Sequence, residues 1–331
     1  MRFRNIVLFL LIFLVSCGPS LPPGFVFPSN PELLARTSLG IHVHPETPNL
    51  IASVEDAMSV VDTIRIQVDF DGVDSLVPQY VIDVAKAVSA QDKTLIVILG
   101  VSPNPAINNP ETWESEAGVF FSKLITLLKN TPSLGDIVFE IGNEPDYFCA
   151  GNQQFSFSDF VFPNCSMTEY LEYLRVVRAH IEPIITIHNL IGDGEWQMMV
   201  AATIPWHQSG RIEMNRELLA SEHTKGMIFN LHIYDPQYPL LVPLMDVYQT
   251  AREQGREVWV TETGSKFRQL NFIRDTYSIL SANGLEFGRV IIYAYNDDTL
   301  GFSLVRLDTD TPQDSDLMYF MRSREASPDA L

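Results

Sequence analysis

Short runs of apolar residues alternate with amphipathic stretches from about residue 39 to residue 322, and several runs contain hardly a polar residue. Runs of this kind are typical of parallel strands, which are buried on both faces. The pattern predicts eight strands, at residues 39–44, 63–70, 94–100, 137–142, 187–193, 227–234, 257–263 and 289–295. The fifth is the least regular of them.

The stretches between these runs predict helices. An Asn-Pro pair at residues 109–110 opens a helix that reaches Lys129, because asparagine caps helices and proline suits their first turn. Capping-box spacing predicts another helix over residues 170–181. A third covers residues 242–254 and ends at Gly255, since glycine readily adopts the left-handed conformation that follows a helix.

Strands that alternate with helices indicate a parallel sheet. Eight such units over residues 39–322 fit the roughly 250 residues of a typical (β/α)8 barrel. We therefore expect an α/β fold, a (β/α)8 TIM barrel over residues 37–325, followed by a short tail at 326–331. A doubly wound open sheet is the alternative, but no glycine-rich phosphate loop follows any early strand.

The N-terminal segment has the features of an export signal. Arg2 and Arg4 precede an apolar run, residues 6–15, that is short for a membrane span. The run ends in Leu-Val-Ser-Cys, which resembles the bacterial lipoprotein signal. That resemblance implies cleavage after residue 16, a lipid on Cys17 and anchoring to the bacterial cell envelope, at the outer membrane where one exists. The alternative is an ordinary signal peptide with an incidental cysteine.

The segment after Cys17 is rich in proline, so residues 17–36 are expected to form a tether rather than a part of the fold. The other two cysteines are Cys149 and Cys165. In an exported protein such a pair usually forms a disulfide, worth about 3 kcal/mol for a loop of this size. Two free thiols are the alternative.

The net charge of −19 indicates which partners to expect. A surface this acidic repels phosphate backbones, so nucleic acid is not expected as a partner. It also disfavours anionic polyuronates relative to neutral sugars. We expect a monomer that contacts the membrane only through its lipid anchor.

Two of the expected strands end in a glutamate. Glu144 follows the fourth strand in Ile-Val-Phe-Glu-Ile-Gly-Asn-Glu-Pro, and Glu262 ends the seventh in Val-Trp-Val-Thr-Glu-Thr-Gly. In a TIM barrel, catalytic groups lie at the carboxyl ends of the strands. A carboxylate at the tip of an apolar strand needs a partner or a function, because burying a lone charge is costly. Glycosidic cleavage provides one, since it uses one protonated and one ionised carboxyl group.

Asn-Glu-Pro after strand four and Thr-Glu at the end of strand seven resemble the signature of glycoside hydrolase clan A, which includes families five and thirty-nine. The resemblance implies a retaining glycosidase that needs no cofactor or metal and acts on β-linked oligo- or polysaccharides. It implies that Glu144 is the acid/base and Glu262 the nucleophile.

The resemblance extends to other strands. Asn143 matches the residue that bonds the sugar 2-hydroxyl, and Arg65 on strand two matches the arginine that supports the nucleophile. His232 and Tyr234 on strand six match a His-x-Tyr pair, whose tyrosine contacts the nucleophile.

The chain departs from this clan at strand eight, where a tryptophan platform is usual. Tyr295 lies at about that position and is expected to stack on the sugar in its place. His42 is expected to line the sugar site. Trp196, with Trp113 and Trp206, lies in expected loops and could supply further subsites or simply pack.

Two alternatives use different chemistry. His42-Val43-His44 ends strand one, where metal-dependent amidohydrolases carry a His-x-His pair. The remaining ligands of such a site could come from Glu144, His188, His232 and Asp297. Against this reading, His188 lies near the start of its expected strand, and Glu262, Asn143 and Arg65 are left without a role. The other alternative is a non-catalytic sugar-binding barrel.

Overall fold

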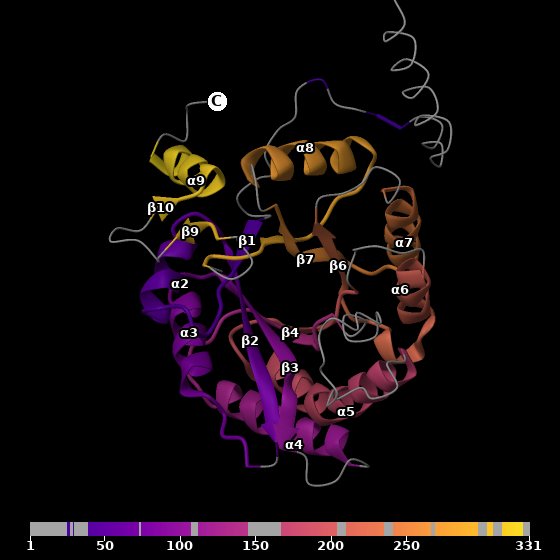
Figure 1. Ribbon diagram of the computed structural model, residues 1–331. Helices are drawn as coiled ribbons and strands as arrows, with labels where there is room; N and C mark the ends of the chain where they lie inside the picture. Colours follow the sequence, from indigo (N-terminus) through magenta and orange to yellow (C-terminus); the bar gives the residue numbers. More distant parts are fainter. Residues whose placement is uncertain are drawn as a thin grey trace, which may run out of the picture.

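The computed structural model describes residues 25–26, 29, 39–72, 74–106, 112–144, 167–203, 210–234, 241–265, 269–296, 303–306 and 313–326. Within these residues, eight parallel strands form a barrel with helices packed around its outside (Figure 1). The expected (β/α)8 TIM barrel is therefore confirmed.

The strands follow one another around the barrel in the order β5-β4-β3-β2-β1-β8-β7-β6. A single parallel bridge between Met199 and Ile228 joins the two end strands and closes the barrel. The bounds of the strands are β1 Leu39–His42, β2 Thr63–Gly72, β3 Thr94–Ala106, β4 Ile137–Ile141, β5 Trp196–Val200, β6 Phe229–Tyr234, β7 Val258–Gly264 and β8 Val290–Ile292.

The helices of the described residues cover the outside of the barrel, and a small hairpin precedes the last of them. Their bounds are α2 Leu50–Met58, α3 Gln79–Ser89, α4 Trp113–Lys129, α5 Met167–Ile191, α6 Gly210–Ala220, the 3₁₀ helix η2 Glu222–Thr224, α7 Leu241–Glu253, α8 Gln269–Ala282 and α9 Asp316–Ala326, with the hairpin strands β9 Val305–Arg306 and β10 Gln313–Asp314. As expected, Gly255 follows α7 with a positive φ of 72°.

The predicted fifth strand is wrong. Residues 187–193 are mostly the last turns of α5, which runs on through Pro183 well past the expected end at residue 181. The true strand is β5, which begins at Trp196. A short apolar run does not by itself distinguish a strand from the end of an amphipathic helix. Here Ile187, Leu190 and Ile191 are exposed, as expected on the outer face of a helix.

The interior of the barrel is apolar at one end and polar at the other. Six buried side chains fill the end at which the strands begin: Ile96, Val138, Met199, Ile228, Trp259 and Ile291. Arg65 and Glu140 lie further along β2 and β4, and neither is exposed. The polar end is the mouth of the barrel, where the carboxyl ends of the strands meet, as in other TIM barrels.

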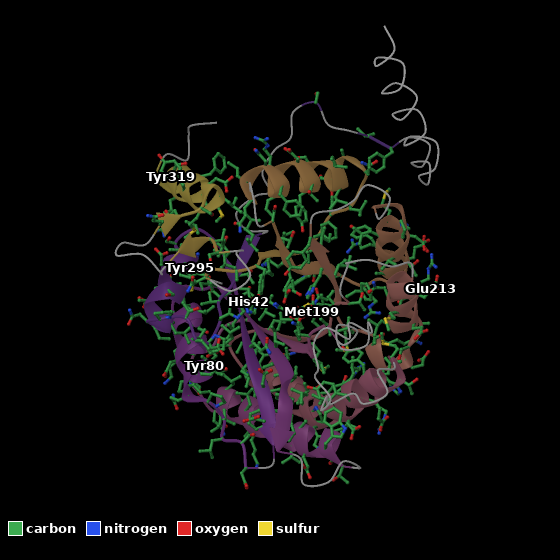
Figure 2. The ribbon with its side chains drawn as sticks, in the orientation of Figure 1. His42, Tyr80, Met199, Glu213, Tyr295 and Tyr319 are labelled. Atoms are coloured by element: carbon green, nitrogen blue, oxygen red, sulfur yellow. The ribbon has the colours of Figure 1, made fainter. Side chains whose placement is uncertain are left out.

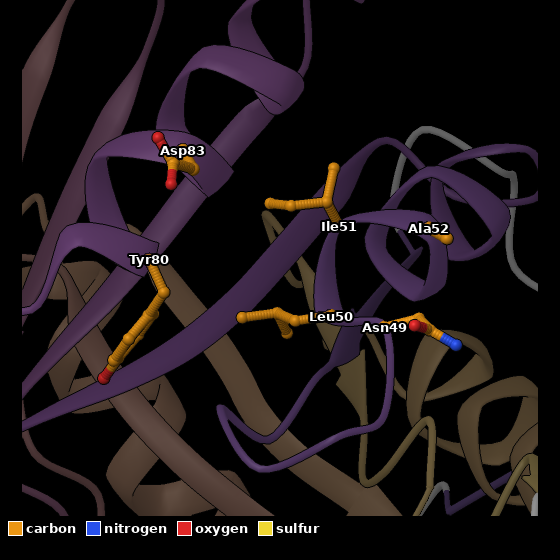
Figure 3. A pocket seen from close by; sticks show the side chains of 6 residues that line it. All are labelled: Asn49, Leu50, Ile51, Ala52, Tyr80 and Asp83. Atoms are coloured by element: carbon orange, nitrogen blue, oxygen red, sulfur yellow. The ribbon is translucent and has the colours of Figure 1, made fainter.

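A shallow groove lies outside the barrel, between α2 and α3. It is lined by Asn49, Leu50, Ile51, Ala52, Tyr80 and Asp83 (Figure 3). Since it is on the outer helical layer, it is separate from the polar mouth.

Several predictions concern residues outside the described part of the chain. Cys17, Cys149 and Cys165 are among them, so the lipid anchor and the disulfide stay predictions. Among the residues that the structure describes, no helix is both long and apolar enough to cross a membrane.

Candidate active site

Arg65 and Glu140 form a buried ion pair at the base of the mouth. Arg65 Nε donates to Glu140 Oε2 at 2.8 Å, and Nη2 donates to Oε1 at 3.0 Å. Asn230 Nδ2 also donates to Oε1, at 2.8 Å. Burial lowers the pKa of Arg65, but the charges of Glu140 and Glu262 more than offset this, so its pKa is raised and it stays protonated.

Arg65 also connects this pair to the predicted site residues. Its Nη1 donates to Glu262 Oε1 at 2.7 Å, and its Nη2 donates to Asn143 Oδ1 at 3.0 Å. The contact expected between Arg65 and Glu262 is therefore present. One arginine thus fixes side chains from β4, β7 and the segment that follows β4.

Glu262 is held as a carboxylate by its surroundings. Its second oxygen accepts a hydrogen bond from the Tyr234 hydroxyl at 2.7 Å, the other contact that the sequence predicts. Burial raises the pKa of Glu262, but the charges of His232 and Arg65 and the two hydrogen bonds outweigh it and lower the pKa to about 2. Burial and the charge of Glu262 raise the pKa of Tyr234, which therefore remains a donor.

A bulge in β7 explains how Glu262 reaches the interior. Relative to β6, strand β7 has one extra residue at Thr261, since Leu231 pairs with Val260 and His232 with Glu262. A bulge re-aims the side chains that follow it. Thr261 can therefore donate to Asn230 inside the barrel at 2.8 Å while its neighbour Glu262 contacts Arg65.

Glu144 lies across the mouth from Glu262. It has a positive φ of 41°, and its Oε1 is 2.7 Å from Nδ1 of His232. The other nitrogen of His232 is 3.2 Å from the Thr261 hydroxyl. One carboxylate oxygen of each glutamate and one nitrogen of His232 lie within 4.8 Å of one another. Two carboxyl groups thus share one small space, and one of them is held ionised.

His42 is placed differently from the prediction. Its side chain is only 1% exposed, so it does not line an open sugar site. Its Nδ1 lies 2.9 Å from Arg65 Nη1, and since arginine can only donate, His42 accepts there and carries its proton on Nε2. Burial and the positive charges nearby lower the pKa of His42 well below its usual value, so it remains neutral. His42 contacts the site through Arg65.

Tyr295 is not the sugar platform. It is 4% exposed, and its hydroxyl donates to Asp56 of α2 at 2.7 Å. Arg322 of α9 binds the same carboxylate, with its Nη2 at 2.7 Å from Oδ2. Figure 2 shows Tyr295 on the side of the molecule where α2 and β9 lie, whereas His42 lies toward the middle of the barrel. The strand was expected over residues 289–295 but ends at Ile292, so Tyr295 lies beyond it.

Tyr293 is the aromatic residue of this segment that lies at the mouth. It is partly exposed, and its ring centroid is 6.4 Å from that of Tyr234 and 5.3 Å from that of His44. The sequence did not distinguish Tyr293 from Tyr295, because both are tyrosines and the choice between them depends on where the strand ends.

Trp196 does not lie in a loop at the sugar site, as the sequence predicted. It is the first residue of β5, at the end of the barrel opposite the mouth, and is 1% exposed. Its ring stacks on His188 at a centroid distance of 3.7 Å. Trp113 stacks on Tyr173 inside the core, so both are packing residues. Trp206 lies outside the described residues.

The geometry does not fit the metal-dependent alternative. His188 is in α5, at the end of the barrel opposite the mouth. The guanidinium of Arg65 donates a hydrogen bond to Nδ1 of His42, so this nitrogen is not available to a metal. Asp297 lies outside the described residues. Within them, the one set of side chains close enough to hold a metal is Glu144, His232 and Glu262. In that set, both oxygens of Glu262 already accept hydrogen bonds, one of them from a cation.

Comparison with known proteins supports the fold. No protein-family model matches the sequence, and neither does any curated protein. Among solved structures, the chain is similar to a mannanase catalytic domain from Streptomyces sp. SirexAA-E, with a TM-score of 0.54, 16% identity and coverage of 94% of this chain and 96% of that one. It is also similar to a mannohexaose complex of the Thermomonospora fusca β-mannanase, with a TM-score of 0.52, 16% identity and coverage of 82% and 84%.

A third similar structure is a triple variant of an endo-β-1,4-glucanase from Xanthomonas axonopodis pv. citri. Its TM-score is 0.59 at 12% identity, with coverage of 87% of this chain and 99% of that one. At these identities the likeness establishes the barrel fold, and the chain spans nearly the whole length of this structure.

Proposed function

We infer that this chain is a retaining β-glycosidase with Glu262 as nucleophile and Glu144 as acid/base. The observation that carries this proposal is the pair of carboxyl groups across the mouth, which have oxygens within 4.8 Å of each other. Retaining glycosidases have carboxyl groups about 5–5.5 Å apart, whereas inverting enzymes need room for a water between them. The short separation therefore supports attack by one of the carboxylates.

The different surroundings of the two glutamates support their different roles. Arg65 and Tyr234 occupy both oxygens of Glu262 and lower its pKa to about 2, so it is ionised when substrate arrives. Glu144 is paired with His232, which can itself carry a proton. Burial lowers the pKa of His232, but the negative charges of Glu262 and Glu144 raise it overall. His232 Nδ1 lies at hydrogen-bond distance from Glu144, so a proton can pass between the group that we assign as acid/base and this histidine.

The reaction then takes place in two steps. In the first, Glu262 bonds to the anomeric carbon as the glycosidic C–O bond breaks, and Glu144 gives its proton to the departing oxygen. In the second, Glu144 takes a proton from water, whose oxygen displaces Glu262 from the anomeric carbon. Glu262 is released as a carboxylate and Glu144 is again protonated, so the product keeps the β configuration.

For the substrate we propose a neutral β-linked polysaccharide such as a mannan or a glucan. The net charge of −19 disfavours anionic polymers. The similar structures named above include mannanases and an endo-β-1,4-glucanase, one of them bound to mannohexaose.

The test is a screen of β-mannans, β-glucans, xylans and aryl β-glycosides with the wild-type protein and two variants. Glu262→Gln should abolish turnover on every substrate, because an amide is a poor nucleophile. Glu257→Gln makes the same change at an exposed position next to the start of the same strand and should retain activity. Turnover by Glu262→Gln at the wild-type rate would refute the assignment.

A further inference from the structure

Strands β2 and β3 extend beyond their neighbours at the mouth. Strand β1 pairs with β2 only as far as His42 and Arg65, and β4 pairs with β3 only as far as Ile141 and Leu99. Beyond those points β2 and β3 remain paired to each other, through to Gly72 and Ala106. The two strands thus form an arm, residues 67–72 and 100–106, that rises above the level of Arg65.

The inner face of this arm carries Gln67 and Asp69. Successive side chains of a strand alternate between its faces, so Gln67 and Asp69 lie on the same face as Arg65. Asp69 is paired in register with Gly100 of β3. A Cβ atom at Gly100 would collide with Oδ1 of Asp69. The missing side chain of Gly100 therefore makes the space in which the Asp69 carboxylate lies.

Asp69 and Gln67 are held in place by neighbouring side chains. The Gln67 amide nitrogen donates to both oxygens of Asp69, at 2.7 Å and 3.0 Å. The Tyr80 hydroxyl of α3 donates to the backbone carbonyl oxygen of Gln67 at 2.6 Å. On the outer face, Phe70 packs against Phe120 of α4 with ring centroids 5.8 Å apart. The pair is therefore fixed on a braced strand, which positions it better than a loop would.

The carboxylate of Asp69 retains capacity to bind a ligand. Both Gln67 and Asp69 are partly exposed, and a carboxylate can accept about four hydrogen bonds. Among the described residues, Gln67 is the one side chain that donates to it. Burial raises the pKa of Asp69, and the nearby charges of Glu46 and Asp71 act in the same direction. Two adjacent hydroxyl groups of a sugar would supply the donors that this carboxylate lacks.

The position of Gln67 and Asp69 indicates which part of a bound substrate they would contact. Glu144 follows β4 and contacts His232 of β6, so the departing part of the substrate, which Glu144 protonates, lies toward that side. The part that stays bonded to Glu262 then extends toward β1, β2 and β8, where Arg65 and Tyr293 lie. The arm with Asp69 stands on this second side.

We propose that Asp69, held by Gln67 in the space beside Gly100, binds two hydroxyl groups of the sugar unit next to the one that Glu262 attacks, on the glycone side. This proposal rests on the proposed glycosidase activity. Asp69 then acts as a specificity-determining residue that favours substrates with at least two glycone units.

The experiment compares 4-nitrophenyl β-monosides with the matching β-biosides, in the mannose or the glucose series, whichever the wild-type protein cleaves. Asp69→Asn should lower kcat/KM on the bioside by about 10- to 100-fold, as expected for losing hydrogen bonds to a charged group. On the monoside, which does not reach Asp69, kcat/KM should be close to that of the wild type. Asp83→Asn removes the same charge from the outer groove and should change neither rate.

Gly100→Ala is a second variant that keeps the charge but pushes the carboxylate out of its place. It should reproduce the selective loss on the bioside. Equal losses on monoside and bioside with both variants, or no loss on either, would overturn the subsite while leaving the glycosidase proposal intact. A wild-type protein that cleaves neither series nor any polysaccharide would overturn both.

Discussion

Arg65 and Glu140 form a two-pronged ion pair inside the barrel, with both side chains fully buried and N–O distances of 2.8 Å and 3.0 Å. Such a pair adds little net stability, because desolvation of the two charges offsets their attraction. What it does is hold Arg65 in one orientation, from which it reaches Glu262 and Asn143 at the same time. The pair therefore connects the core of the barrel to the carboxylate that we propose as nucleophile.

Replacing Glu140 should be costly. Glu140→Gln leaves Arg65 with less compensation in a buried site, and we expect a loss in unfolding free energy on the order of 3 kcal/mol. Urea unfolding measures this. Glu213→Gln is the control, since Glu213 pairs with Arg216 on the surface and its loss should cost far less stability. Equal costs for the two variants would contradict the role given to Glu140.

Stability should depend on pH through Glu262. Its pKa is about 2 in the folded protein against an ordinary 4.5, so folding favours the ionised form. A carboxyl group with a lowered pKa contributes stability above its unfolded pKa and loses it as the pH falls through the folded pKa. The wild type should therefore lose stability between pH 4.5 and about 2. Glu262→Gln should lose less over that window, and a parallel decline in both proteins would show that Glu262 is not the group responsible.

Tyr293 and Tyr295 should respond in opposite ways to substitution. Tyr295→Phe removes the hydrogen bond to Asp56 and should cost about 1 kcal/mol of stability with kcat unchanged. Tyr293→Ala removes a ring from the mouth and should lower kcat/KM by about tenfold. Thermal unfolding and steady-state kinetics separate the two effects. If Tyr295→Phe lost activity while Tyr293→Ala did not, the assignment of Tyr293 rather than Tyr295 to the substrate site would be wrong.

The fold could be predicted from the sequence because seven of the eight strands are apolar runs bounded by helical patterns. Strand β5 could not, since the apolar run that resembled it is the end of α5, and the real strand begins only at Trp196. The length of α5 was also hidden, because Pro183 would usually end a helix. The local pattern of apolar residues does not show which of two neighbouring segments forms the strand and which continues the helix.

The central pair of the site was predictable because Glu144 and Glu262 follow apolar strands. Glu140 was missed, although a lone charge within Ile-Val-Phe-Glu-Ile needs a buried partner, and Arg65 in Ile-Arg-Ile is the matching signal. The placement of His42 and Trp196 depends on which end and which face of the barrel each occupies. Such information comes from register, which the sequence does not display.

The predicted lipid anchor can be tested on the mature protein. Cleavage before Cys17 and acylation of its thiol should leave a lipid adduct in the intact mass and direct the protein to the membrane fraction. Cys17→Ala should release the protein or leave its signal uncut. A mature wild-type protein without the adduct would remove the basis for the anchor, with no effect on the proposed catalytic residues.

The central claim is that Glu144 and Glu262 act in two separate steps, and chemical rescue of Glu144→Ala tests it most directly. The variant should lose activity on natural saccharides by about 10²- to 10⁴-fold, since their leaving groups need a proton. It should still transfer the sugar of an activated aryl β-glycoside to Glu262, and added azide should then restore turnover. We expect the product to be the β-glycosyl azide, identified by NMR. An α-glycosyl azide, or no response to azide at all, would contradict the account.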